Sequence, residues 1–223
     1  MTVVDNLRRL TGRSSDVVER VAGLQQAVEA ARGRLDDSLV EGGHVNPYRN
    51  NFEFTLLADP KTINAFALPG GKVFITRGLF KDLETEGQLA GVLGHEIGHV
   101  IERHSNQQMA KQKLFSGLAA AGGVAGGDAQ SARMAQAAAQ LVSMKYGRED
   151  ENQADEWGVR LTTLAGYDPR AMIGVMEIIA KASAGHEQPE FFSTHPNPGN
   201  REAHLKALIE HEFPNGMPKG LEP

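Results

Sequence analysis

Residues 89–104 read Leu-Ala-Gly-Val-Leu-Gly-His-Glu-Ile-Gly-His-Val-Ile-Glu-Arg-His and contain the pattern His95-Glu96-Ile97-Gly98-His99. Apolar residues recur around it at steps of three and four, which predicts one helix from Glu84 to about Leu114. Positions i and i+4 lie on the same face of a helix, one turn apart. The two histidines therefore project together from one side of this helix.

This spacing suits a metal site. Two imidazoles one turn apart can bind a single zinc ion, each at about 2.0–2.1 Å. Glu96 lies about 100° further round the helix, where it can reach a water activated by the metal and act as a general base. The pattern predicts a zinc-dependent metalloendopeptidase with one zinc per chain. The plain alternative is two core or solvated histidines on an ordinary helix.

A catalytic zinc normally has three protein ligands, so a third must come from elsewhere. His104 comes five residues after His99 and points off the site face of a continuous helix. Glu151 is the better candidate, on a helix predicted for residues 148–165, with Asp155 one turn further along the same face. Asp155 could accept a hydrogen bond from a ligand histidine. The alternative is that both are solvent-facing members of an acidic run.

The rest of the pattern predicts an α+β fold that is mostly helical, as one domain over residues 1–223. Helices at 1–45 precede a catalytic core at about 50–212. The other predicted elements are strands near residues 52–56, 63–68 and 73–76, a hairpin formed by residues 63–76, and helices at 169–183 and 199–212. We expect the small sheet to pack on the helix that carries His95, and the Glu151 helix to cross it.

Composition excludes several classes of function. The chain has 223 residues, 40% of them hydrophobic, and a net charge of −5, which disfavours nucleic acid as a partner. It has no cysteine, so disulfides, thiolate metal sites and a cysteine nucleophile are excluded. We find no signal peptide and no stretch near the roughly 18 apolar residues of a spanning helix.

Three further segments carry a family resemblance. They are Asn64-Ala-Phe-Ala-Leu-Pro-Gly-Gly-Lys-Val73, Gly147-Arg-Glu-Asp-Glu-Asn-Gln-Ala-Asp155, and Ser193-Thr-His-Pro196 followed by Arg201. Together with the His95–His99 motif, they run from about residue 52 to 205 in the order of the gluzincin metallopeptidases that include HtpX, the CAAX prenyl protease and the Oma-type proteases. The chain most resembles the soluble periplasmic BepA-like branch. Gly147 stands where that family often has serine.

The resemblance implies roles for named residues. It implies that His95, His99 and Glu151 hold the zinc, that Glu96 is the catalytic base and that Asp155 supports a ligand. His195 and Arg201 match catalytic groups near the metal that stabilise the oxyanion or hold the substrate backbone. In BepA-like relatives the equivalent histidine can also occupy the open zinc position, and His195 could do so here. Its alternative is an ordinary loop histidine before a proline.

Two segments are expected to meet other molecules. The strand Asn64, Ala65, Phe66 and Ala67 is our candidate to pair with a substrate peptide, unless it is an ordinary paired strand. Residues 117–143, rich in Ala and Gly, form either a mobile lid or peripheral membrane-contacting element, or a loosely packed helical hairpin. The sequence leaves the oligomeric state open.

The expected function is cleavage of internal peptide bonds in protein or peptide substrates, as part of protein quality control. One alternative is a zinc-binding chaperone or scaffold with little proteolysis, kept inactive by His195. A second is a non-enzymatic helical interaction module, which leaves Glu96, Glu151 and Asp155 as coincidence. The resemblance alone implies a periplasmic or membrane-associated location.

Overall fold

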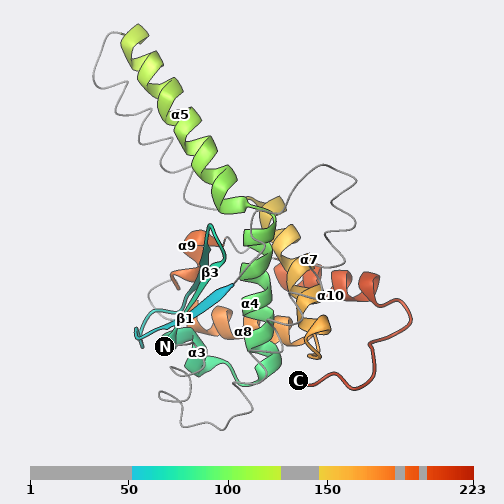
Figure 1. Cartoon of the computed structure of the whole chain (residues 1–223). Helices are drawn as coiled ribbons and strands as arrows, with labels where there is room; N and C mark the ends of the chain where they lie inside the picture. The colour runs from blue at the N-terminus through green and yellow to red at the C-terminus, as the bar shows by residue number, and fades with distance from the viewer. Residues whose placement is uncertain (1–51, 127–145, 184–188, 196–199) are drawn as a thin grey trace.

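The computed structural model describes residues 52–126, 146–183, 189–195 and 200–223. The helices predicted for residues 1–45 lie outside these residues, as does the segment 127–143. Within the described part, the fold is mostly helical with one small sheet (Figure 1), which confirms the predicted α+β class.

The sheet has three strands, β1 (Glu53–Leu57), β2 (Ala65–Leu68) and β3 (Lys72–Thr76). Their order is β1-β3-β2, with β3 parallel to β1 and antiparallel to β2. Gly70 and Gly71 both have positive φ angles, as the tight turn between β2 and β3 requires. Alternate side chains point into the core, which agrees with the alternation seen in the sequence. The predicted hairpin is therefore confirmed.

The described helices are α3 (Arg77–Asp82), α4 (Glu86–Ile101), α5 (His104–Gly126), α7 (Arg148–Leu164), α8 (Ala171–Ser183), α9 (Phe191–Thr194) and α10 (Arg201–Glu212). Helix α4 runs through the centre of the body, with the sheet on one side and α7 on the other (Figure 1). Short helix α9 lies between α8 and α10 in the chain and directly precedes His195.

Helix α4 is the core helix of the domain. It begins at a capping box in which Thr85 accepts a hydrogen bond from the backbone of Gln88, and the Gln88 side chain accepts one from the backbone of Thr85. Every residue from Gly87 to Val100 is buried. A helix buried on all faces holds its polar side chains inside the protein, so His95, Glu96 and His99 are shielded from bulk water.

The predicted helix from Glu84 to Leu114 is wrong at one point. Helix α4 ends at Ile101, and α5 begins at His104 after a corner at which Arg103 has a φ of 59°. A non-glycine residue rarely adopts this left-handed conformation, because its Cβ crowds the backbone. The corner turns α5 away from the body (Figure 1).

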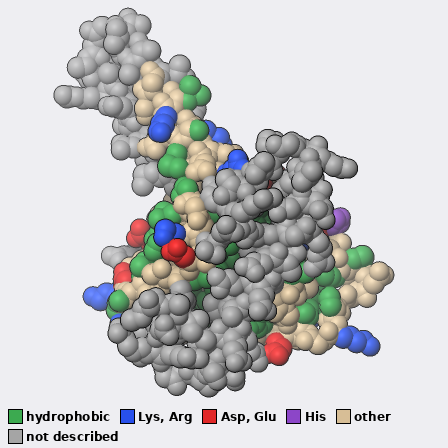
Figure 2. Space-filling model, in the orientation of Figure 1, with side chains coloured by type: hydrophobic (Ala, Val, Ile, Leu, Met, Phe, Trp, Pro, Cys, Tyr) green, Lys and Arg blue, Asp and Glu red, His purple; other side chains and the backbone are tan. Residues whose placement is uncertain are grey.

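Helix α5 carries exposed basic and hydrophobic side chains, including Met109, Lys111, Lys113 and Leu114 (Figure 2). Residues 117–126 are helical, while the rest of the predicted contact element lies outside the described residues. No helix in the described part of the chain combines the length and the apolar character needed to span a membrane. Peripheral membrane contact by this region stays a prediction.

Glycines allow α4 and α7 to approach each other closely. A Cβ added at Gly98 would lie 2.8 Å from Cβ of Trp157 and 3.0 Å from the backbone of Ala154. One turn earlier, a Cβ at Gly94 would lie 3.3 Å from the backbone of Gly158. This contact sets α7 directly against the helix that carries the two histidines.

We predict that Gly98→Ala destabilises the fold by about 1–3 kcal/mol, because the new methyl group meets backbone and Cβ atoms that cannot rotate away. Gly117→Ala is the matched control, since Gly117 is exposed in α5 and its Cβ would meet nothing within 4 Å. The control should be neutral or stabilising by up to about 1 kcal/mol. Thermal denaturation measures both changes, and equal melting temperatures for Gly98→Ala and wild type would contradict this account of the packing.

Candidate metal centre

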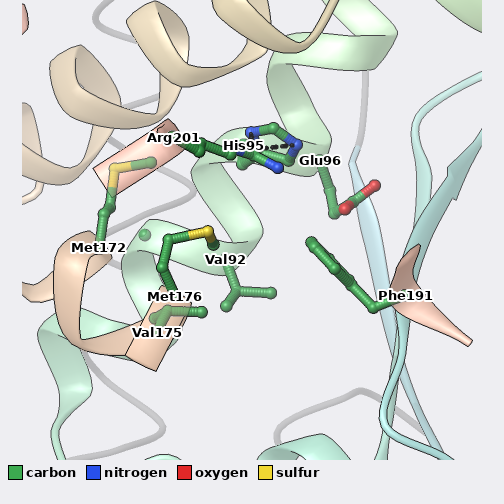
Figure 3. A pocket seen from close by; sticks show the side chains of 9 residues that line it. Val92, His95, Glu96, Met172, Val175, Met176, Phe191 and Arg201 are labelled. Atoms are coloured by element: carbon green, nitrogen blue, oxygen red, sulfur yellow. Dashed lines mark hydrogen bonds between the residues drawn. The ribbon is translucent and has the colours of Figure 1, made fainter. Parts of the chain in front are cut away.

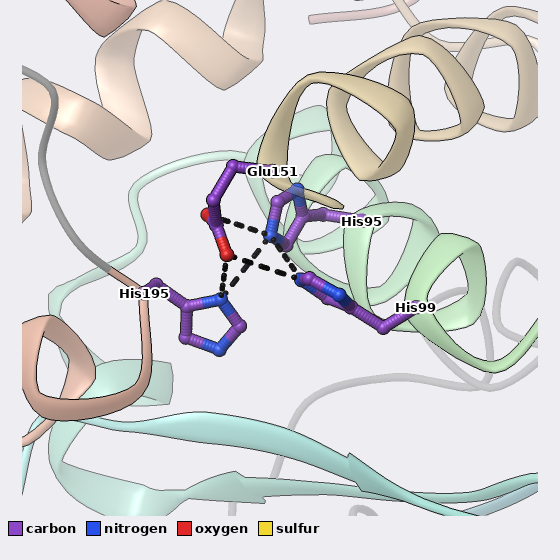
Figure 4. Close-up of side chains that lie close together, drawn as sticks. All are labelled: His95, His99, Glu151 and His195. Carbon is purple, nitrogen blue, oxygen red and sulfur yellow. Dashed lines mark hydrogen bonds and ion pairs between the residues drawn. The ribbon is translucent and has the colours of Figure 1, made fainter. Parts of the chain in front are cut away.

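Four side chains with metal-binding atoms converge in the interior. His95 and His99 come from α4, Glu151 from the first turn of α7, and His195 from the residue after α9 (Figure 4). All four are buried, and their ligand atoms lie within 4.8 Å of one another. The structure thus brings together both motif histidines, the predicted third ligand and the histidine of the Ser-Thr-His-Pro segment.

The spacing of these atoms fits zinc. Ligands about 2.1 Å from a tetrahedral zinc lie about 3.4 Å from one another. Here the Nε2 atoms of His95 and His99 are 3.1 Å apart, and Glu151 oxygens lie 3.6 Å and 3.5 Å from them. Nδ1 of His195 is 3.4 Å from Nε2 of His95 and 3.1 Å from Oε1 of Glu151. With His195, these nitrogen and carboxylate atoms make a closed set of four donors. Without His195, they would make a set of three donors with one open position.

His95 is oriented from behind by an acid. Its Nδ1 lies 2.9 Å from Oδ1 of Asp155, which also accepts a 2.6 Å hydrogen bond from Arg201. A Nδ1–H bonded to this carboxylate leaves the Nε2 lone pair facing the cluster. The structure thus places Asp155 directly behind His95, and its support of a metal ligand stays a prediction.

His99 is held by two residues that the sequence did not point to. The Tyr146 ring stacks on the imidazole with ring centroids 4.0 Å apart, and its hydroxyl lies 2.9 Å from Oγ of Ser105. Nδ1 of His104 lies 2.9 Å from Nδ1 of His99. His104 is not among the four clustered donors, but the break at residue 103 turns its ring back against His99, a contact that the expected continuous helix does not allow.

Glu96 lies beside the cluster, with its pKa raised by burial. Neither of its oxygens accepts a hydrogen bond from the described residues, and Nε2 of His195 lies 3.4 Å from Oε1. A buried carboxylate with a raised pKa and free acceptor sites is well suited to take a proton from water.

His195 is fixed by its own loop. Phe191 stacks on the imidazole at a centroid distance of 4.4 Å, and the backbone N–H of His195 donates to Phe191. The backbone N–H of Phe191 in turn donates to the carbonyl of Ile63, just before β2. Burial alone would lower the pKa of His195, but Glu96 and Glu151 raise it above its ordinary value.

Arg201 is the cationic centre of the site. Burial opposes its charge, yet Asp155 and Glu151 raise its pKa further. Its Nη1 lies 2.7 Å from Oε2 of Glu151. Burial would raise the pKa of both acids, but His195 and Arg201 lower that of Glu151, and Arg201 and His95 lower that of Asp155. Both acids are therefore charged and available as acceptors or ligands.

Burial and the neighbouring histidines lower the pKa of His99 well below its ordinary value. Its imidazole is therefore neutral near pH 7, which is the form that binds a metal.

An apolar pocket opens next to Glu96 (Figure 3). Its lining consists of Gly91, Val92, His95, Glu96, Met172, Val175, Met176, Phe191 and Arg201. The lining is apolar apart from His95, Glu96 and Arg201, and the flexible methionine side chains would have to move before the pocket could hold an apolar side chain.

Strand β2 is an edge strand in the described sheet, next to α4. Ala65 and Ala67 point into the core, whereas the Phe66 side chain is half-buried and stacks on Phe74. Asn64 precedes the strand, and its backbone pairs with Thr76. One side of β2 is thus paired with β3, and the other side pairs with no strand among the described residues.

Comparison with known proteins identifies the family. Residues 37–209, more than half of the chain, match peptidase family M48. The chain belongs to peptidase family M48. The suspected gluzincin relationship is therefore correct, and the four-donor cluster lies at the metal motif of this M48 domain.

Several relatives of this M48 domain carry protease names. This chain is 32% identical to the beta-barrel assembly-enhancing protease of Escherichia coli over 168 residues, which cover 71% of this chain and 34% of that protein. This chain is 31% identical to the mitochondrial metalloendopeptidase OMA1 of Arabidopsis thaliana over 152 residues, which cover 68% of this chain and 30% of that protein. The metalloprotease YcaL of Escherichia coli is 26% identical over 210 residues, 92% of this chain and 75% of that protein. The chain therefore spans about a third of the length of the first two relatives.

We predict that Asp155→Asn weakens binding of a divalent metal by about 10–100-fold, because His95 loses the carboxylate that fixes its tautomer and orientation. Glu156→Gln, at the adjacent half-buried acid, is the matched control and should bind as wild type. Competition with a chromophoric chelator measures both affinities. Equal affinities for Asp155→Asn and wild type would show that the carboxylate does not orient the ligand.

Proposed function

We propose that this M48 domain is a zinc-dependent metalloendopeptidase. The observation that carries the proposal is the set of four buried side chains whose ligand atoms lie within 4.8 Å of one another, with the Glu96 carboxylate beside it. His95, His99 and Glu151 would hold one zinc ion. A bound zinc supplies a Lewis acid that polarises the scissile carbonyl and lowers the pKa of a water near it.

Glu96 is the proposed base. Its carboxylate takes a proton from the attacking water and passes it to the amine that leaves when the peptide bond breaks. Its raised pKa brings its proton affinity closer to that of the groups with which it exchanges the proton. Burial in α4 fixes the carboxylate beside the cluster, so little reorganisation is needed during the reaction.

His195 and Arg201 are proposed to act on the oxyanion and on the substrate backbone. Both side chains can donate hydrogen bonds, and both lie at the cluster. Nε2 of His195 lies toward Glu96, and its Nδ1 lies toward Glu151. With His195 placed as in the structure, the site would have four protein donors and no open position, so we take this arrangement as an inactive form. In an active form, His195 would lie outside the donor set and be free to donate a hydrogen bond to the oxyanion.

The proposed substrates are unfolded or misassembled proteins, bound in extended form. A peptide added along the free side of β2, at Ala65–Ala67, would present its backbone to the cluster. The apolar pocket beside Glu96 would receive a neighbouring side chain. The named relatives include a protease that enhances beta-barrel assembly, which supports a role in protein quality control and a periplasmic or membrane-associated location.

We predict that Glu96→Gln lowers kcat for an unfolded protein substrate by about 10²–10⁴-fold, because the amide cannot accept the proton. Zinc content should stay at the wild-type level, since Glu96 holds no metal. Glu177→Gln, at an exposed acid on α8, is the control and should keep full activity.

The Glu96→Gln variant also distinguishes a peptidase from a zinc-binding scaffold. A zinc-binding scaffold would show no peptidase activity in the wild type and no functional change in Glu96→Gln. A wild-type protein that cleaves unfolded substrates, together with a Glu96→Gln variant that cleaves equally well, would show that another group is the base.

A further inference from the structure

The two metal-motif histidines are oriented by different chemistry. His95 has the Asp155 carboxylate behind it, but the partner behind His99 is another imidazole. His104 is buried, and its Nδ1 lies 2.9 Å from Nδ1 of His99. Its other ring nitrogen, Nε2, lies 3.0 Å from Oε1 of Gln153 and 3.8 Å from Oδ1 of Asp150, both on α7. An imidazole thus bridges the ligand histidine to the helix that supplies Glu151.

The corner at Arg103 makes this contact. On a continuous helix, a residue five positions after His99 would lie roughly 140° away around the axis. The left-handed conformation of Arg103 breaks the helix and brings the His104 ring back against His99. Such a conformation costs about 1–2 kcal/mol, so the surrounding contacts must stabilise it.

The positions of the protons follow from the hydrogen-bond chain. Nε2 of His99 faces the cluster and must keep its lone pair free to bind a metal. The proton of His99 is then on Nδ1, and at 2.9 Å it must be donated to Nδ1 of His104. His104 in turn carries its proton on Nε2 and donates it to Oε1 of Gln153, an atom that can only accept. Each step has one donor and one acceptor.

We propose that His104 is a positioning residue of the metal centre. Through Nδ1 it accepts a hydrogen bond from the Nδ1–H of His99. This bond fixes the tautomer and ring orientation in which Nε2 of His99 binds zinc, and Gln153 fixes the tautomer of His104. The proposal rests on the proposed function in that it takes His99 as a zinc ligand.

The first test reads the protons directly. In the zinc-loaded wild-type protein with ¹⁵N-labelled histidine, the ring nitrogen shifts should show Nδ1 of His104 unprotonated and Nε2 protonated. A trans-hydrogen-bond coupling should join Nδ1 of His104 to Nδ1 of His99. A proton on Nδ1 of His104 would overturn the proposal, and this measurement needs no variant to fold.

The second test compares two substitutions. His104→Leu fills the space but cannot accept a hydrogen bond, and should weaken zinc binding about 10–100-fold. His104→Asn places its side-chain oxygen near the former Nδ1 and should recover most of the affinity. The same two substitutions at His204, which is half-buried on α10, are the matched controls and should leave affinity unchanged.

The outcomes separate this proposal from the proposed function. Leu and Asn variants that are equally weak, or equally tight, would overturn the role of His104 as an acceptor while leaving the zinc site intact. A wild-type protein that binds no zinc would instead contradict the metal centre itself.

Discussion

Within the described part of the chain, three buried carboxylates lie at the candidate metal centre, with one arginine among them. Glu96, Glu151 and Asp155 are each at most 1% exposed, and Arg201 is the buried cation that pairs with two of them. Charges without partners are costly in a protein interior. A divalent cation held by His95, His99 and Glu151 would add positive charge to that of Arg201 and would favour the ionised form of these acids. The surplus of buried carboxylates therefore favours a cation at this place in the fold.

The fold is arranged to hold these charges in place. Helix α4 is buried on all sides, and the glycine contact at Gly98 brings α7 close enough for Glu151 and Asp155 to reach the histidines from opposite sides. Helix α9, which precedes His195, is hydrogen-bonded at both ends. The backbone N–H of Phe191 donates to Ile63 before β2, and that of Tyr146, just before α7, donates to Thr194. The loop that carries His195 is thus coupled to the edge strand where we propose that substrate binds.

The sequence predicted the parts of the site that follow from local geometry. Helical spacing was enough to place His95, Glu96 and His99, and to put Asp155 one turn after Glu151 on a single face. That Glu151 meets the histidines, and that His195 and Arg201 join them, depends on packing between distant segments. The residues alone made Glu151 a candidate ligand, whereas only the family resemblance indicated His195 and Arg201. The contact of His104 could not be predicted, because it depends on a left-handed residue at Arg103 that no sequence pattern signalled. The contact of Tyr146 with His99 depends on how the chain before α7 packs on α4. The break at Arg103 also explains why one helix was predicted where there are two.

The most direct test of the metal centre is the zinc content of the purified protein, compared between wild type and Glu151→Ala by elemental analysis. The account predicts one zinc per chain in the wild type and a strong reduction in the variant, because Glu151 is the one ligand that α7 supplies. Full zinc retention without Glu151 would contradict the proposed ligand set and point to His195 as the third ligand. A wild-type protein without zinc, prepared in the absence of chelators, would contradict the metallopeptidase account as a whole.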